Sequence, residues 1–436
     1  MPKRVWLLCL LSLLGAVPAQ AQLRGHGGPV RALAISADGA TALSGSFDTS
    51  AILWSLKTNT AEQVLRFHDG AVNAVAFLGN GRVATSGADA RIAIWKAGET
   101  QPLTVLEGHT APVVALAVSP DGKTLASASW DRTVRLWPLA GGFSSFSPRV
   151  LEGHQQNVNG VAFLPDGSAV VSAGYDATLR IWPLGGGGGG SGAGAPVVVT
   201  MPTPLNAVVA SPDGEILCAG ADGKVYVLSS AGDLRATIPA DKTPIIALAI
   251  SRDGALVAAA GIRGAVEVID RARRKVVQTL VGPGLPVWSA AFFPDSRTLL
   301  TGGADRMIRR WDAVTGEPIG SVTAGGPSDP LAAYAGDPGA QVFRACVACH
   351  TLKPDQGNRA GPTLAGLFGR RIATLPGYNF SPALKKLDIV WTPETVAKLF
   401  ELGPATFTPG TKMPEQTIGS AADRAALIKF LQKATR

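Results

Sequence analysis

GHTAPVVALAVSPDGKTLASASWDRTVRLW is the sequence of residues 108–137. Two alternating apolar runs lie in it, at 113–118 and 134–137, and the pair Asp121-Gly122 lies between them. Alternation with a period of two predicts short β-strands that bury one face. Asp-Gly is a strong signal for a tight turn between two strands.

Six further turn pairs recur along the chain at intervals of 40–47 residues, each between alternating apolar runs. They are Asp38-Gly39, Asn80-Gly81, Asp166-Gly167, Asp213-Gly214, Asp253-Gly254 and Asp295-Ser296. Short strands at even spacing, joined by such turns, are typical of a β-propeller. We therefore expect an all-β propeller of seven repeats.

Polar and aromatic residues recur at fixed positions within these repeats. Five repeats carry Asp followed six residues later by Trp, with Ser or Thr four residues before the Asp, and four have His 21 or 22 residues before it. The Asp/Trp pairs are Asp48/Trp54, Asp89/Trp95, Asp131/Trp137, Asp176/Trp182 and Asp305/Trp311, and the histidines are His26, His68, His109 and His154. This arrangement resembles the WD-repeat family. The resemblance implies one buried hydrogen-bonded network per blade, so that these histidines are structural.

The last three repeats depart from this pattern. Cys218 and Leu228 replace the hydroxyl and the Trp in the fifth repeat, Arg263 replaces the Asp in the sixth, and Pro283 replaces the His in the seventh. We expect the fifth and sixth blades to rely on apolar packing alone. The sequence does not decide whether residues 22–24 or residues 318–322 complete the seventh blade.

The start of the chain has the pattern of an export signal. Lys3 and Arg4 precede an apolar run of 13 residues, and Ala19-Gln20-Ala21 fits a cleavage site. A membrane span needs about 20 apolar residues. We expect a cleaved signal peptide at 1–21, a periplasmic protein, and no transmembrane span in the mature chain. The expected domains are the propeller at 22–323, a linker at 324–336 and a second domain at 337–436.

The second domain contains the motif Cys346-Val347-Ala348-Cys349-His350. Two thiols at this spacing can each bond one vinyl group of a porphyrin, and the adjacent His350 then reaches the iron. The alternative is a dithiol redox pair, which requires a thioredoxin-like βαβ context that is not found here. The motif therefore favours covalent haem attachment.

The wider pattern of residues 335–436 resembles the mitochondrial-like, class I cytochrome c family. The matching segments are Gly361-Pro362-Thr363-Leu364, Gly366-Leu367-Phe368-Gly369-Arg370, Trp391, and Pro409-Gly410-Thr411-Lys412-Met413. The resemblance implies an all-α domain with one covalent haem c, whose iron is ligated by His350 and Met413. It also implies that the Pro362 carbonyl holds the His350 ring, and that Arg370 and Trp391 contact the haem propionates. Phe400 stands where many relatives have a tyrosine.

Charge is concentrated in this second domain. Residues 335–436 carry a net charge of +6, whereas residues 22–334 carry 25 basic and 25 acidic residues. Lys353, Lys385, Lys386 and Lys412 are candidates to attract acidic redox protein partners. A charge confined to one small domain does not favour nucleic acid as a partner. The four cysteines exclude a disulfide framework.

These observations predict an exported electron carrier fused to a protein-binding platform, rather than a catalyst. The alternative is a haem enzyme, either a peroxidase or an oxidoreductase with a propeller-bound cofactor, in which the cytochrome relays electrons. WD signatures, seven repeats and the absence of a spare histidine argue against a second propeller cofactor. A third hypothesis is that the propeller covers the haem edge of its own cytochrome.

Overall fold

The computed structural model of this 436-residue chain contains two domains. It describes residues 22–139, 147–185, 194–281, 285–319, 331–334, 336–343, 346, 350–356, 361–378, 380, 382–409, 411, 413 and 418–436. The expected signal peptide and most of the expected linker lie outside these residues, as do Pro283, Cys349 and Lys412.

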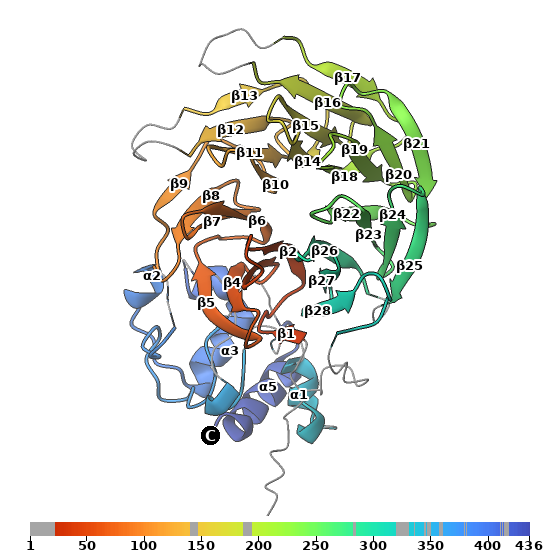
Figure 1. Ribbon diagram of the computed structural model, residues 1–436. Coiled ribbons are helices and arrows are strands. Elements are labelled where there is room, and N and C mark those ends of the chain that lie inside the picture. The colour runs from red at the N-terminus through yellow and green to blue at the C-terminus, as the bar shows by residue number, and fades with distance from the viewer. Residues whose placement is uncertain are drawn as a thin grey trace, which may run out of the picture.

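The first domain is the expected seven-bladed propeller (Figure 1), with four antiparallel strands in every blade. Blade 1 holds β2 (Val30–Ile35), β3 (Thr41–Ser46), β4 (Ser50–Ser55) and β5 (Thr60–Arg66); blade 2 holds β6 (Val72–Gly79), β7 (Arg82–Gly87), β8 (Ile92–Lys96) and β9 (Thr104–Leu106); blade 3 holds β10 (Val113–Val118), β11 (Thr124–Ser129), β12 (Val134–Pro138) and β13 (Arg149–Leu151); blade 4 holds β14 (Val158–Phe163), β15 (Ala169–Gly174), β16 (Thr178–Pro183) and β17 (Val197–Thr200). Blade 5 holds β18 (Leu205–Ala210), β19 (Ile216–Gly220), β20 (Lys224–Leu228) and β21 (Leu234–Pro239); blade 6 holds β22 (Ile245–Ile250), β23 (Leu256–Gly261), β24 (Ala265–Asp270) and β25 (Lys275–Val281); blade 7 holds β26 (Val287–Phe292), β27 (Thr298–Gly303), β28 (Met307–Asp312) and β1 (Gln22–Arg24).

The turn between β10 and β11 shows why Asp-Gly recurs. Gly122 has a φ of 70°, which side-chain-bearing residues rarely adopt. The Asp121 carboxylate accepts hydrogen bonds from the Ser119 hydroxyl at 2.6 Å and from the Lys123 amide at 3.0 Å. The turn is therefore fixed by local chemistry, as the sequence predicted.

Hydrophobic cores lie between neighbouring blades. One such core joins Leu43 and Leu53 of blade 1 to Val75 and Trp95 of blade 2. Another joins Trp54 of blade 1 to blade 7. Each blade is thus held by the apolar faces of both neighbours, and closing the ring completes the last core.

A polar network fixes the strand packing in the blades that keep the WD residues. In blade 3, His109 Nδ1 lies 2.7 Å from an Asp131 carboxylate oxygen, and His109 Nε2 lies 2.7 Å from Ser127 Oγ. The Trp137 indole N–H donates to the same Ser127 oxygen at 2.9 Å. The equivalent bonds occur around His26, His68 and His154, which are all buried. These histidines are structural, as the sequence predicted.

Blade 5 corrects the expectation of apolar packing alone. The Tyr226 hydroxyl donates to the Asp222 carboxylate at 2.5 Å, next to the buried Cys218. Burial and this carboxylate raise the pKa of the Tyr226 hydroxyl. A tyrosine on β20 thus replaces the missing His as the partner of the blade Asp. Sequence reasoning missed this pair because it searched only the family positions.

The seventh blade is completed by both segments that competed for it. β1 pairs with the first half of β28, with Gln22 opposite Arg309. Residues 317–319 pair with the second half, where the Ile319 amide donates to the Arg310 carbonyl at 2.9 Å and Pro318 forms a bridge with Trp311. The outer edge of β28 is therefore covered along its length, which protects it from further strand pairing.

The second domain contains short helices separated by loops. The helices are η1 (Ala332–Tyr334), α1 (Pro338–Phe343), η2 (Pro354–Gln356), α2 (Pro382–Lys385), α3 (Pro393–Leu402), α4 (Pro404–Phe407) and α5 (Ala421–Ala434). Much of the described domain is loop and turn, so the expected all-α class is only partly supported.

Packing of α1 on α5 forms the base of this domain. Phe343 and Phe430 lie with ring centroids 5.4 Å apart, and a Cβ atom on Gly339 would meet the Ala426 carbonyl oxygen. Thr392 and Ser420 cap α3 and α5, since each side chain accepts a backbone N–H three residues later at 3.2 Å.

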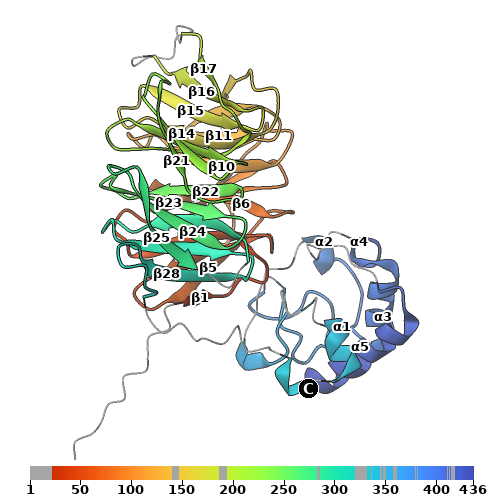
Figure 2. The ribbon, with the colours of Figure 1, turned by 90° about the vertical axis from the view of Figure 1, so that its right-hand side faces the viewer.

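The two domains lie side by side. Figure 2 shows the second domain beside blade 1, the red part of the propeller. Leu331 and Tyr334, which fall in the expected linker, pack into the core of the second domain. None of the helices in the described part of the chain has the length and apolarity that a membrane span requires.

Candidate haem-binding site

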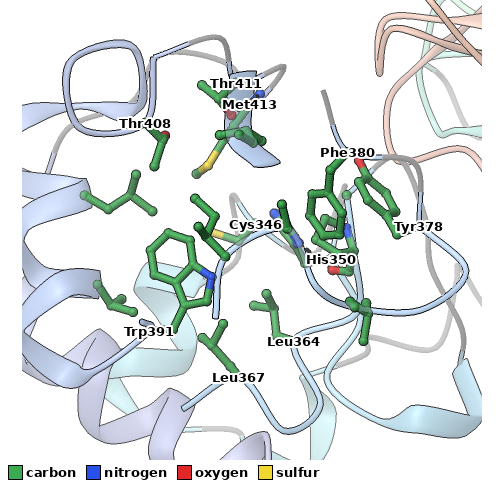
Figure 3. A pocket seen from close by; sticks show the side chains of 18 of the residues that line it. Cys346, His350, Leu364, Leu367, Tyr378, Phe380, Trp391, Thr408, Thr411 and Met413 are labelled. Carbon is green, nitrogen blue, oxygen red and sulfur yellow. Dashed lines mark hydrogen bonds between the residues drawn. The ribbon is translucent and has the colours of Figure 1, made fainter. Parts of the chain in front are cut away.

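A cavity of about 450 Å³ lies in the second domain and reaches the propeller (Figure 3). Six of the seven site residues predicted from the sequence line it, namely Cys346, His350, Pro362, Arg370, Trp391 and Met413. The seventh, Cys349, lies outside the described residues. The remaining wall is mostly apolar and is built by Phe343, Leu364, Leu367, Leu399, Phe400 and Leu431, among others. A largely apolar cavity with a few polar groups is the usual form of a cofactor site.

The His350 ring is fixed from two sides. Its Nδ1 lies 2.8 Å from the Pro362 carbonyl oxygen, so Nδ1–H donates and the lone pair remains on Nε2. A Cβ atom on Gly361 would lie 2.4 Å from His350 Cε1 and 2.7 Å from Nδ1. Glycine is therefore required beside the ring. The carbonyl makes the imidazole a better metal ligand by holding its tautomer and raising its basicity.

Cys346 is tied to His350 through the backbone. The His350 amide donates to the Cys346 carbonyl at 2.9 Å, which is the spacing of one helical turn. The Cys346 side chain is buried and lines the cavity. The side chains of Cys346 and His350, which are four residues apart, thus both line the cavity.

Arg370 and Trp391 lie on two segments that pair with each other. The Trp391 amide donates to the Arg370 carbonyl at 3.0 Å, and the Gly369 amide donates to the Trp391 carbonyl at 2.8 Å. The Arg370 guanidinium donates to the carbonyls of Ala365 and Thr363 at 2.9 and 3.0 Å. It therefore also holds the loop that presents Pro362, a role that the sequence did not predict.

Burial lowers the pKa of Arg370, since a guanidinium loses hydration inside the domain. Among the described residues, its recorded hydrogen bonds go to carbonyl oxygens, and it forms no ion pair. A partly buried cation beside an apolar cavity suits a ligand with carboxylate groups. The donor set, the apolar wall and this cation all fit a haem.

Met413 reaches the cavity from a separate loop. Its amide donates to the Thr411 hydroxyl at 3.1 Å, and both residues line the cavity. Figure 3 shows the Met413 sulfur on the cavity side of this loop. Phe400 lies in the wall and is buried, so a tyrosine hydroxyl is absent from its position. A thioether and an imidazole from two loops form the soft ligand pair that c-type iron sites use.

Comparison with known families separates the two halves of the chain. The WD domain, G-beta repeat family matches residues 18–55, 59–96, 100–138, 146–183 and 274–312. These matches fall on the repeats that keep the Asp and Trp pair. The cytochrome c family matches residues 336–435.

Individual relatives support the second match. Cytochrome c of Cochliobolus lunatus and cytochrome c of Arabidopsis thaliana are each 40% identical over 99 residues, which is 22% of this chain and 91% and 88% of those proteins. Cytochrome c of Ginkgo biloba is 38% identical over 110 residues, or 25% of this chain and 91% of the relative. Fold and site thus define a WD propeller joined to a c-type cytochrome. Through its C-terminal domain the chain belongs to the cytochrome c family, and this domain binds haem c covalently.

The sequence suggested that the propeller could cover the haem edge, but it did not predict which propeller residues line the cavity. Six propeller residues line it, namely Gly27, Gly28, Pro29, Phe47, Asp48 and Thr49. One signal in the sequence pointed to them. The repeats place Asp69, Thr110 and Gln155 directly after the blade histidine, whereas the first repeat has Gly27 there.

Proposed function

We propose that this protein is an exported electron carrier, in which one haem c transfers single electrons and the propeller binds a protein partner. The observation that carries the proposal is the cavity that brings His350 and Met413 together. Bound haem supplies one-electron redox chemistry. His350 and Met413 would hold the iron from the protein side, and their fixed positions would keep ligand rearrangement small during one-electron transfer.

The surrounding residues have positioning roles. Pro362 and Gly361 hold His350 in one orientation, and Arg370 secures the Pro362 loop. Leu364, Leu367 and the other apolar wall residues exclude water from the cavity. Rigid ligands and a dry cavity favour rapid outer-sphere transfer over binding of exogenous ligands.

Exposed aromatic side chains support a docking role for the propeller. Trp130 and Tyr175 are 44% and 47% exposed, and each directly precedes the Asp of its blade. They therefore lie on the same face of the ring, in the turns between second and third strands. Exposed aromatic residues are enriched in protein interfaces. Lys353, Lys385 and Lys386 are also exposed, which favours an acidic partner.

Export is inferred from the N-terminal pattern, in which Lys3 and Arg4 precede an apolar run and Ala19-Gln20-Ala21 fits a cleavage site. Fractionation of the host cell and N-terminal sequencing test this point. A mature protein in the periplasm that starts at Gln22 is expected, and a cytoplasmic protein that retains residues 1–21 would contradict export.

The deciding experiment is an optical spectrum of the purified haem-loaded protein, oxidised and reduced, with and without carbon monoxide. We expect a low-spin spectrum with the weak far-red sulfur-to-iron band, no reaction with carbon monoxide, and one haem per chain. A high-spin spectrum, ready binding of carbon monoxide or a second chromophore would contradict the proposal that the protein is an electron carrier.

The second candidate is a peroxidase, a haem enzyme in which the Met413 side of the cavity would be open to peroxide. Phe400 favours it, because the wall has no hydroxyl at that position to restrain the thioether. Restoring the hydroxyl with Phe400→Tyr separates the two functions. An electron carrier keeps its low-spin spectrum in both the wild type and the variant. A peroxidase turns over peroxide in the wild type and loses this activity in the variant.

A further inference from the structure

Two loops of blade 1 take part in the cavity wall. Residues 27–29 join β1 to β2, and residues 47–49 join β3 to β4. They lie on the face of the propeller that also carries Trp130 and Tyr175. The cavity is thus built from both domains, although they are separated by about three hundred residues of sequence.

The repeats provide an internal comparison for blade 1. The Asp48 side chain is 0% exposed, whereas its counterparts Asp89, Asp131 and Asp176 are 8%, 5% and 5% exposed. Gly27 is buried, whereas Thr110 and Gln155 at the equivalent positions of blades 3 and 4 are exposed. Blades 1 to 4 share one architecture, so the difference comes from what covers blade 1. The cavity wall places cytochrome residues 371–375, Tyr378 and Phe380 there.

A cation–π contact holds the two domains together at this point. The Arg66 guanidinium of blade 1 lies 4.9 Å from the centroid of the Tyr378 ring. Tyr378 packs edge-on against Phe380 at 4.6 Å, and both aromatic rings line the cavity. Figure 3 shows this pair at the edge of the cavity away from Trp391. The contact therefore couples blade 1 directly to residues of the cofactor site.

Small residues in blade 1 allow the two domains to pack closely. Gly27 has no side chain to separate the domains, and a Cβ atom on Gly28 would lie 2.9 Å from the Asp48 amide nitrogen. Phe47 adds an apolar surface beside the two glycines. A glycine pair followed by proline and flanked by an aromatic residue makes a thin, rigid and apolar wall.

We propose that blade 1 is part of the haem site, with residues 27–29 and 47–49 forming the wall that keeps water from the bound haem. This proposal rests on haem binding by the second domain. Exclusion of water lowers the local dielectric constant, which disfavours the extra positive charge of ferric iron. The propeller wall therefore raises the reduction potential of the haem.

The test replaces Gly27 with a residue that the propeller already tolerates elsewhere. Gly27→Gln reproduces Gln155 of blade 4, where the backbone amide makes the same bond to the blade Asp as in blade 1. Thr110→Gln places the same side chain on blade 3, away from the cavity, and is the matched control. Phe47→Ser and its control Tyr175→Ser provide a second pair at equivalent positions.

Two readouts are taken on the full-length, haem-loaded chain. Spectroelectrochemistry should show a lower midpoint potential in Gly27→Gln and Phe47→Ser, and no change in either control. Amide exchange should become severalfold faster at residues 371–378 in the same two variants, while α5 keeps its protection. Unchanged potential and exchange in both variants would overturn the proposal. A wild-type protein without a low-spin haem would instead reject the proposed function, so the two failures are distinguishable.

Discussion

Single backbone positions set the geometry of the haem ligand. The His350 ring is confined between the Pro362 carbonyl, which accepts its Nδ1–H, and Gly361, which leaves no room for a side chain. A methyl group at Gly361 would therefore displace the imidazole that should bind iron.

Gly361→Ala should destabilise the haem-loaded protein by about 1–3 kcal/mol, as expected for overpacking, and should weaken the low-spin spectrum. Thermal unfolding and the optical spectrum measure these effects. Gly419→Ala is the control, because a Cβ atom there meets nothing within 4 Å. Equal behaviour of the two variants would show that the Gly361 contact does not position the ring.

The blade carboxylates give the propeller a defined acid sensitivity. Burial alone would raise the pKa of Asp48, but the charge of His26 and hydrogen bonds from His26 and Ser50 lower it from 3.8 to about 2. A carboxylate with a lowered folded-state pKa stabilises the protein above its unfolded pKa and loses that contribution as pH falls. The free energy of unfolding should therefore decrease between about pH 4 and pH 2.

Asp131→Asn removes one such carboxylate, far from the cavity. It should destabilise the propeller at pH 7 by about 1.5–3 kcal/mol, because His109 loses a charged hydrogen-bond partner. Urea unfolding at pH 7 and at pH 3 should show this difference shrinking at low pH. The exposed Glu152→Gln serves as control, and an equal loss at both pH values would contradict the role of the charge.

Cys218 should be inert in the folded protein. Burial raises the pKa of its thiol to about 12, and the side chain is fully enclosed in blade 5. The thiolate needed for alkylation is then almost absent at pH 8. Iodoacetamide should modify Cys218 only after unfolding, as mass spectrometry can measure. Rapid labelling of the native protein would contradict this packing.

Ring closure depends on one strand with two partners. β28 pairs with β1 along Met307–Arg309 and with residues 317–319 along its second half. Leu23 of β1 is buried in the core between blades 7 and 1, whereas Ile319 is only half-buried. The N-terminal segment should therefore supply most of the closure energy.

Leu23→Ala should destabilise the propeller by about 2–5 kcal/mol, the usual cost of removing a buried leucine side chain. Ile319→Ala should cost clearly less. Thermal unfolding followed by circular dichroism compares the two variants. A larger effect at Ile319 would assign closure to the C-terminal segment instead.

The distribution of charge over the two domains should govern encounters with redox partners. The excess of basic over acidic residues lies in the cytochrome domain, where residues 335–436 carry a net charge of +6 and residues 22–334 carry none. Lys353, Lys385 and Lys386 are exposed there. Fields from such a cluster raise the association rate of anionic partners at low ionic strength.

Replacement of these three lysines by glutamate should slow oxidation of the reduced protein by ferricyanide by about tenfold at low salt. Stopped-flow measurements should show that the difference disappears at high salt, because ions screen the exposed charges. A cationic oxidant is the control and should react faster with the variant. Equal rates with ferricyanide would show that the lysines do not steer partners.

Features that depend on neighbouring residues could be predicted from the sequence. The Asp-Gly turns and the alternating strands are local, and each followed from a short pattern. The haem motif and the Met413 loop were found in the same way. The repeats helped further, because a structural role for His109 implied the same role for the histidines at the equivalent positions of three other blades.

Contacts between distant segments could only be decided by the tertiary structure. No local pattern divides β28 between two terminal segments. The propeller wall of the haem cavity is the largest such case. It depends on the packing of two domains, and Gly27 contributes by lacking a side chain, which carries little signal in a chain with 52 glycines. The sequence by itself thus determined the repeats and the cofactor, while the fold decided what surrounds them, since packing energy comes from surfaces that meet only when the chain has folded.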